Sequence, residues 1–428
     1  MRPRHLCFIA SLLVAIIMLS SVTLHGQPRD QQSRDQQPWA GGTITRLDGS
    51  TISSQVADSI VQQLVRQYGI TGLQIALVNG GRLVWSEAYG VRARGDGAGS
   101  APAGPDLPMQ RSTTTWAASI TKAIFGTYVM QLVEQGRFDL DLPIVRQLPL
   151  SLDSYAPYRD KAALIVQDTL WSRITPRMLL SHTSGLVNFA TMEPSGWMRL
   201  HDVPGTRYRY SGEGINLLQF VIEQRLGHPL DSLMQSAFFT PLGMPHTSLT
   251  FRADFADDIA DRFGADGHFL AKTRRAPARA AGSMTTSADD LATFVVALMD
   301  NRLMRASTRR EMLSPHVRIS AQTQFGPGSE VADGDEAARV GLAYGMGWGL
   351  LLHTRHGTAF FKEGHGDGAQ TYLLCFLRQR SCIVLLANSD NGEFAFRALV
   401  NGLFGTDDVP WTWEGWTPEQ IRESRRNR

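Results

Sequence analysis

The chain is organised around the sequence Trp-Ala-Ala-Ser-Ile-Thr-Lys at residues 116–122, which runs on into the apolar residues 123–130. Ser119 and Lys122 stand three positions apart, so a helix beginning here would place the hydroxyl and the amine on one face. The first turn of a helix leaves backbone N–H groups unpaired and favours negative charge. A serine in this position has a base beside it and donors around it, which are the parts of an activated nucleophile. The alternative is a surface helix that begins with a serine near its cap.

Lysine is rare in this chain, whose cations are mostly arginine. Only four lysines occur, at positions 122, 161, 272 and 362. Arginine stays protonated in proteins, whereas a desolvated lysine can lose its proton and act as a base. Lys122 and Lys362 are therefore candidate functional residues, although ordinary codon usage would also leave a few lysines.

The composition indicates a globular protein with one large domain or two medium ones. Of the 428 residues, 43% are hydrophobic and 19% are charged. The formal net charge is +2, and Arg2 and Arg4 account for it because residues 1–26 contain no acidic residue. The remainder is nearly neutral, which argues against nucleic acid as a partner.

The N-terminus has the pattern of an export signal. Basic residues at positions 2, 4 and 5 precede an apolar run from residue 6 to about residue 22, with small residues at its end. We expect a signal peptide at 1–26, a disordered lead at 27–42, and export to the periplasm or the medium. An uncleaved N-terminal anchor is the alternative, and only in that case would the protein contact a membrane.

Strand patterns lie at both ends of the chain and helical patterns lie between them. Asn79-Gly80-Gly81 separates two apolar segments and predicts a hairpin. We expect an α+β (α/β sandwich) fold with one antiparallel sheet, built from N- and C-terminal strands and flanked by helices. A mostly helical region is inserted at about 120–280, and the active site would lie between this region and the sheet. The catalytic domain would span 43–405, followed by a solvated tail at 406–428. Helices are expected at 58–68, 119–136, 215–226, 230–239, 288–299 and 394–403, and a further helix begins at 176. Strands are expected at 73–78, 82–89, 350–352, 359–362, 371–377 and 382–388. A loop or flap is expected at 317–339.

Two cysteines lie outside the expected signal, Cys375 and Cys382. They flank residues 378–381, a plausible hairpin turn between two apolar strands. A disulfide is one alternative in an oxidising compartment. Because the geometry of a cross-strand disulfide is demanding, we expect reduced core cysteines instead.

Three short motifs follow one another in the chain: Ser-x-x-Lys at 119–122, Tyr-Ser-Gly at 210–212 and Lys-Glu-Gly at 362–364. In this order they resemble the serine β-lactamase and penicillin-binding-protein superfamily, closest to its branch of class C β-lactamases, D-Ala-D-Ala carboxypeptidases and esterases. That family carries S-x-x-K, then Y-x-N, then K-T-G or H-x-G. Further family-like phrases lie at 180–186, 204–206, 241–244 and 281–284, so the resemblance covers about 69–405.

The resemblance implies a site for acyl transfer. Ser119 would be acylated, and Lys122 would take its proton. Tyr210 would pass that proton to the leaving group and then activate water, while Lys362 would hold Tyr210 electrostatically and attract a carboxylate. By position in the third motif, Gly364 and His365 would lie at the oxyanion hole, formed by the backbone N–H groups of Ser119 and His365. No cofactor is implied.

Two positions depart from the family pattern. Gly212 stands where an asparagine would normally bond a substrate amide, and Glu363 adds a negative charge that opposes carboxylate binding through Lys362. Both weaken the case for β-lactam or peptide substrates and leave esters or small amides open. The expected function is thus an exported serine hydrolase of an ester, amide or β-lactam bond, acting on a small-molecule or peptide substrate. The alternative is a non-catalytic penicillin-binding-like protein that binds cell-wall peptides. Separately, with Ser119 as the nucleophile, Tyr210 could be a core residue instead of a catalytic one.

Histidines suggest other roles that we do not favour. His182 is expected to be structural, bonding a turn, rather than catalytic. His365 and Asp367 raise the idea of a metal ion, but no third and fourth ligand follow at zinc-like spacing. We therefore expect no metal site.

Overall fold

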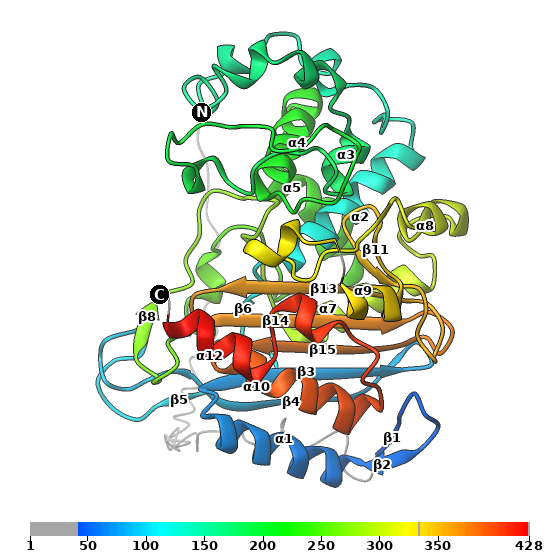
Figure 1. Cartoon of the computed structure of the whole chain (residues 1–428). Helices are drawn as coiled ribbons and strands as arrows, with labels where there is room; N and C mark the ends of the chain where they lie inside the picture. The colour runs from blue at the N-terminus through cyan, green and yellow to red at the C-terminus, as the bar shows by residue number, and fades with distance from the viewer. Residues whose placement is uncertain (1–41, 333, 427–428) are drawn as a thin grey trace, which may run out of the picture. The chain divides into compact units, whose positions relative to one another are not determined.

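The computed structural model describes residues 42–332 and 334–426. Its centre is an antiparallel sheet that has nine strands within these residues, in the order β10-β11-β12-β13-β14-β15-β3-β4-β5. The N-terminal hairpin β3–β4 pairs with the last strand, β15, so the two ends of the chain meet in the middle of one sheet (Figure 1). The strands are β3 Gly72–Asn79, β4 Arg82–Ala93, β5 Leu107–Pro108, β10 Val317–Arg318, β11 Leu342–Tyr344, β12 Gly349–Leu351, β13 Ala359–Gly366, β14 Ala369–Phe376 and β15 Ser381–Ala387.

Turn residues explain the central hairpin. Gly80 and Gly81 both have positive φ, 56° and 79°, which only glycine adopts readily and which matches the twist of the strands. Three two-stranded ladders accompany the large sheet: β1 Thr43–Thr45 with β2 Thr51–Ser53, β6 Thr115–Trp116 with β9 Thr285–Thr286, and β7 Arg262–Phe263 with β8 Phe269–Ala271.

Helices cover both faces of the sheet. Because side chains alternate along a strand, Ile75 and Leu77 of β3 join the core beneath α1 and α10, whereas Ala76 and Val78 join the core shared with α2 and α7. Figure 1 shows α1 and α10 against the sheet. The helices are α1 Ser54–Tyr68, α2 Ile120–Glu134, α3 Pro176–Leu180, α4 Gly212–Leu226, α5 Leu230–Met234, α6 Thr240–Leu242, α7 Ala288–Met299, α8 Ala306–Met312, α9 Asp335–Val340, α10 Gly392–Leu399, α11 Trp411–Glu414 and α12 Pro418–Arg426.

Capping residues set the helix boundaries near the expected positions. The side chains of Ser53, Thr175, Ser211 and Ser287 each accept a hydrogen bond from the first turn of the following helix. Gly69 and Gly227 end α1 and α4 in the left-handed conformation. The α+β fold, with one antiparallel sheet built from both ends of the chain, is confirmed. The segment 317–339 is mostly irregular, as expected, and contains only short elements before α9.

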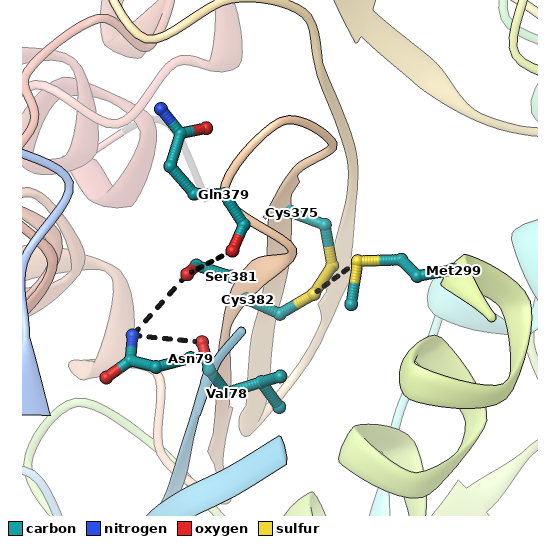
Figure 2. Close-up of a disulfide and its surroundings, with 7 residues drawn as sticks. All are labelled: Val78, Asn79, Met299, Cys375, Gln379, Ser381 and Cys382. Atoms are coloured by element: carbon teal, nitrogen blue, oxygen red, sulfur yellow. Dashed lines mark hydrogen bonds between the residues drawn. A yellow bond between two sulfur atoms is a disulfide. The ribbon is translucent and has the colours of Figure 1, made fainter. Parts of the chain in front are cut away.

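The expectation of reduced cysteines was wrong. Cys375 and Cys382 form a disulfide, shown in Figure 2 beside Met299 of α7. The register explains the pairing: the two residues lie directly opposite each other on β14 and β15, with their Cα atoms 4.1 Å apart. Both side chains therefore point to the same face of the sheet, within reach of one bond.

The expectation of a solvated C-terminal tail was also wrong for its three tryptophans. Trp411, Trp413 and Trp416 are at most 2% exposed and pack into the core on the α1 and α10 side. Tyr372 of β14 and Phe396 of α10 contact the ring of Trp416. Burial of three large indoles outweighs the charge of the arginine-rich end that suggested a solvated segment.

Residues 1–41 lie outside the described part of the chain, and with them the predicted signal peptide and nearly all of the disordered lead. Among the described helices, none is both long and apolar enough to cross a membrane.

Candidate active site

Ser119 lies at the start of α2, where strand β6 turns into the helix. Ala118, just before it, has φ 45°, a left-handed conformation that a non-glycine residue adopts only at a cost. Ser119 occupies the N-cap position, but its side chain makes no capping bond. Its Oγ instead accepts a hydrogen bond from Nζ of Lys122 at 3.0 Å. The turn thus presents a half-buried hydroxyl that is available for chemistry.

Lys122 is buried beneath this hydroxyl, with 1% of its surface exposed. Helix α2 is apolar on nearly all sides, as expected of a helix inside a protein. Nζ of Lys122 also donates to the carbonyl oxygen of Ala281 at 2.5 Å and lies 4.9 Å from the centre of the Tyr210 ring. Burial lowers the pKa of Lys122, and the nearby charge of Lys362 lowers it further. The neutral amine, which is the form that accepts a proton, therefore forms more readily here than in a free lysine.

Tyr210 lies between the two lysines. It precedes α4, and Nζ of Lys362 is 5.1 Å from the centre of its ring, on which His182 also packs with ring centres 4.5 Å apart. The Nδ1 atom of His182 accepts a hydrogen bond from the backbone N–H of Ser211 at 3.2 Å. Burial first, and then the two lysines, hold the pKa of His182 well below its usual range. His182 is thus a neutral residue that fixes the backbone beside Tyr210, in keeping with the structural role expected for it.

Lys362 and Glu363, on β13, form a buried ion pair. Gln324 donates a second hydrogen bond to the Glu363 carboxylate at 2.8 Å. Burial by itself would lower the pKa of Lys362, but the carboxylate of Glu363 outweighs it and raises that pKa. Burial would raise the pKa of Glu363, yet Lys362 holds it below the usual value. Lys362 therefore remains a cation, and its charge is already compensated before any substrate arrives.

Strand β13 passes close to the nucleophile at Gly364. A Cβ atom on Gly364 would lie 2.6 Å from the carbonyl oxygen of Ala117 and 3.1 Å from the backbone nitrogen of Ser119, so only glycine allows this approach. The next residue, His365, lines the cavity. Its imidazole contacts Trp416 and the carboxylate of Glu393, 3.3 Å away. The close approach of β13 to Ser119 is the place where an oxyanion hole would form.

Gly212 begins α4, and the structure explains why no asparagine stands there. A Cβ atom on Gly212 would lie 2.2 Å from the ring of Phe189. The backbone N–H of Gly212 donates instead to Oδ1 of Asn188 at 2.9 Å, and Asn188 lines the cavity. Sequence reasoning missed Asn188 and Phe189, although both follow closely on the family-like phrase at 180–186.

These residues surround a cavity of about 320 Å³. The structure brings together Ser119, Lys122, Tyr210 and Lys362, which come from three distant parts of the chain, and sets Ser119, Lys122, Tyr210 and Glu363 in the cavity wall. Sequence reasoning also missed other residues of the wall, among them Trp116, Asn216, Arg275, Arg279 and Phe325. In the described part of the chain, no group of three or more His, Cys, Asp or Glu residues could hold a metal ion.

Comparisons with known proteins concern the family of the sequence and the fold. A sequence model of the family described as Beta-lactamase matches residues 57–403. Protein flp of Staphylococcus aureus is 24% identical over 213 residues, which cover 46% of this chain and 38% of the relative. The match thus spans well under half of that relative's length.

Solved structures share the fold at low sequence identity. The octameric penicillin-binding protein homologue from Pyrococcus abyssi has a TM-score of 0.64 at 18% identity, over 85% of this chain and 80% of the other. The β-lactamase/D-alanine carboxypeptidase from Pseudomonas syringae has a TM-score of 0.62 at 18% identity, over 84% of this chain and 99% of the other. At this identity the likeness concerns the fold.

Proposed function

Because the chain belongs to the β-lactamase family, we propose that it is an exported serine hydrolase that cleaves esters or small amides through an acyl-enzyme on Ser119. Family membership supports the broader class of serine hydrolases. The bond that is cleaved, the export and the residue roles belong to the proposal.

One observation carries the proposal: two lysines lie over the same tyrosine ring, and Lys122 contacts a serine hydroxyl whereas Lys362 contacts a carboxylate. The pKa of Lys122 is lowered and that of Lys362 is raised. When two groups of the same kind have different environments, their pKa values move apart, so that one can act as a base while the other stays charged. Lys122, 3.0 Å from Oγ of Ser119, is the base, and Lys362 is the cation that holds Tyr210.

The reaction then proceeds in two halves. Neutral Lys122 takes the Oγ proton of Ser119 as the oxygen attacks the acyl carbon, and backbone N–H groups at Ser119 and His365 bind the oxyanion. Tyr210 gives a proton to the leaving group, and the bond to that group breaks. In the second half, water gives a proton to Tyr210 as its oxygen attacks the acyl carbon. The bond from that carbon to Ser119 Oγ breaks, and Oγ takes its proton back from Lys122 as the acid is released.

The preference for esters and small amides rests on the two departures from the family pattern. Glu363 compensates Lys362, so a carboxylate on the leaving side gains little from that cation. Phe189 occupies the space that an asparagine side chain at position 212 would need. The Cys375–Cys382 disulfide supports export, because disulfides persist in oxidising compartments.

The test combines labelling with turnover. Purified protein is incubated with a fluorophosphonate, and intact mass and peptide mapping follow, with Ser119→Ala as the control. We expect one adduct on Ser119 and none on the variant. p-Nitrophenyl butyrate should be hydrolysed at least about 100-fold faster, in kcat/KM, than the β-lactam nitrocefin, which corresponds to about 2.7 kcal/mol of transition-state stabilisation.

Each contrary result has a definite meaning. Absence of an adduct, with wild type and Ser119→Ala behaving alike, would favour the non-catalytic peptide-binding protein. An adduct combined with equal turnover of ester and β-lactam would leave the hydrolase in place and remove the proposed preference.

A further inference from the structure

Arginines form one end of the active-site cavity. Arg275 and Arg279 line it, on the segment 272–279, whose sequence Lys-Thr-Arg-Arg-Ala-Pro-Ala-Arg holds four cations and no acidic residue. The acid in the cavity wall is Glu363, which is paired with Lys362. The arginines therefore leave this end of the cavity positively charged.

Arg275 is half-buried without a compensating carboxylate. Its guanidinium lies over the indole of Trp116, 4.0 Å from the ring centre. Burial, and then the guanidinium groups of Arg262 and Arg279, lower the pKa of Arg275. Within residues 42–332 and 334–426, no ion pair or hydrogen bond joins the side chain of Arg275 or Arg279 to an acidic residue. A desolvated cation surrounded by cations is unfavourable until an anion reaches it.

Contacts along strand β13 show where the arginine end of the cavity lies relative to Ser119. Ser119 contacts the strand at Gly364, Tyr210 lies near Lys362, and the ring of Trp116 lies against Gly366. Lys362 and Gly366 are four residues apart, or about 13 Å in an extended strand. Tyr210 and Trp116 are therefore on opposite sides of the nucleophile.

We propose that Arg275 and Arg279 bind a carboxylate at the far end of the substrate's acyl group, an inference that rests on the proposed function. Tyr210 gives its proton to the leaving group, so the leaving group lies on the Tyr210 side. The acyl chain then extends past Trp116 to the two guanidinium groups. The substrate class is the half-ester of a dicarboxylic acid: hydrolysis breaks the acyl carbon–oxygen bond, adds water, and releases an alcohol and a dicarboxylate.

The experiment compares two esters that differ in one charge, p-nitrophenyl monoadipate and p-nitrophenyl methyl adipate. For the wild type, kcat/KM should be about tenfold higher for the monoadipate than for the methyl ester, mainly through a lower KM. A gain of this size is what one charge-assisted hydrogen-bonded pair contributes. Arg275→Gln and Arg279→Gln should each reduce this ratio, and the double variant should bring it near one. Raised salt should reduce the ratio as well.

A matched control lies next to the site. Arg274 is exposed and lies over Phe251, 4.9 Å from its ring centre, rather than lining the cavity. Arg274→Gln removes the same charge from the same segment and should preserve the preference for the monoadipate. An equal loss in Arg274→Gln and Arg275→Gln would show a diffuse field instead of a binding site and would overturn the inference.

Two further measurements distinguish a failure of this inference from a failure of the proposed function. A preference for 3-carboxyphenyl butyrate over phenyl butyrate that Arg275→Gln abolishes would place the carboxylate on the leaving group and overturn the acyl-side assignment. Fluorophosphonate labelling of Ser119 with no preference for either adipate would overturn this inference alone. No labelling and no ester turnover would overturn the proposed function and this inference with it.

Discussion

Lys122 and Lys362 carry the same side chain and lie 4.9 Å and 5.1 Å from the centre of one tyrosine ring. They differ in their immediate neighbours. Nζ of Lys122 contacts a serine hydroxyl and a backbone carbonyl, whereas Nζ of Lys362 contacts a carboxylate. A buried amine without an anion tends to lose its proton, and one with an anion keeps it. The scarcity of lysine in the chain was therefore an informative signal at these two positions.

Lys122→Arg tests whether the proton affinity of Lys122 matters or only its charge. Arginine keeps a cation beside Ser119 but does not deprotonate in proteins, so kcat/KM for p-nitrophenyl butyrate should fall by about 100-fold or more. Lys161→Arg is the matched control, because Lys161 pairs with Glu213 outside the catalytic group and should tolerate the change. Near-normal turnover by Lys122→Arg would exclude Lys122 as the base.

The pH profile gives a second test of the base. Below its pKa, Lys122 is protonated and cannot accept the Ser119 proton, so kcat/KM should rise with pH through that pKa, which lies below the ordinary value of 10.5. The charge of Glu363 raises the pKa of Lys122, so Glu363→Gln should move the rising limb to lower pH. Glu419→Gln, at an exposed position of helix α12, should leave the limb in place. A limb displaced to higher pH in Glu363→Gln would contradict the assignment.

At the scale of elements, the start of α4 shows how packing has altered a motif. Gly212 occupies the first residue of the helix, and the ring of Phe189 fills the space beside it. The amide that a family asparagine would offer at this position is absent, while Asn188 bonds the Gly212 backbone from across the turn. Asn188 and Phe189 therefore form this part of the cavity wall, where position 212 offers no side chain.

Gly212→Asn should destabilise the fold rather than restore the family motif. The new Cβ would meet the Phe189 ring at 2.2 Å, and such overpacking costs about 1–3 kcal/mol. Thermal unfolding should show a lower Tm, and Phe189→Ala in the same chain should recover part of the loss. Gly227→Asn, at the other end of α4, is the control: its Cβ would meet nothing within 4 Å, and asparagine tolerates the left-handed conformation there. An unchanged Tm in Gly212→Asn would show that Phe189 moves aside freely.

Most of the helices and strands could be predicted from local sequence patterns. The glycine turn after Asn79 is a short-range signal, and it separates β3 from β4 in the structure. The family motifs named the central side chains of the candidate site. The features that could not be predicted from the sequence depend on contacts between residues far apart in the chain. The Cys375–Cys382 pairing requires the register of β14 and β15, and Arg275 reaches Trp116 across about 160 residues of sequence, a separation at which composition and periodicity carry no signal.

At the scale of the whole molecule, the sheet separates two cores, and the C-terminal segment completes one of them. Trp413 packs near Phe361 of β13 and Tyr208, and its carbonyl oxygen accepts a hydrogen bond from the backbone N–H of Gln324 at 2.8 Å. Gln324 in turn bonds Glu363. The tail therefore supports the catalytic wall through one intermediate residue.

Removal of residues 406–428 should cost both stability and activity. Three buried indoles leave the core, and burial of about 150–250 Å² by each contributes roughly 4–6 kcal/mol at about 25 cal/mol per Å². We expect an insoluble protein or a Tm lowered by more than about 10 °C, measured by calorimetry or circular dichroism. Removal of residues 422–428 alone keeps the three tryptophans and Ile421 and should leave both properties close to normal. A stable, active chain without residues 406–428 would contradict the role given to the tail.

The pairing of β3 with β15 has a consequence for biosynthesis. A ribosome must release nearly the entire chain before the middle of the sheet can close, because one partner strand emerges early and the other emerges last. The nascent polypeptide therefore carries Ser119 without the opposing wall supplied by β13. On the proposed function, a translation product that ends before β13 lacks one wall of the site and should show no turnover.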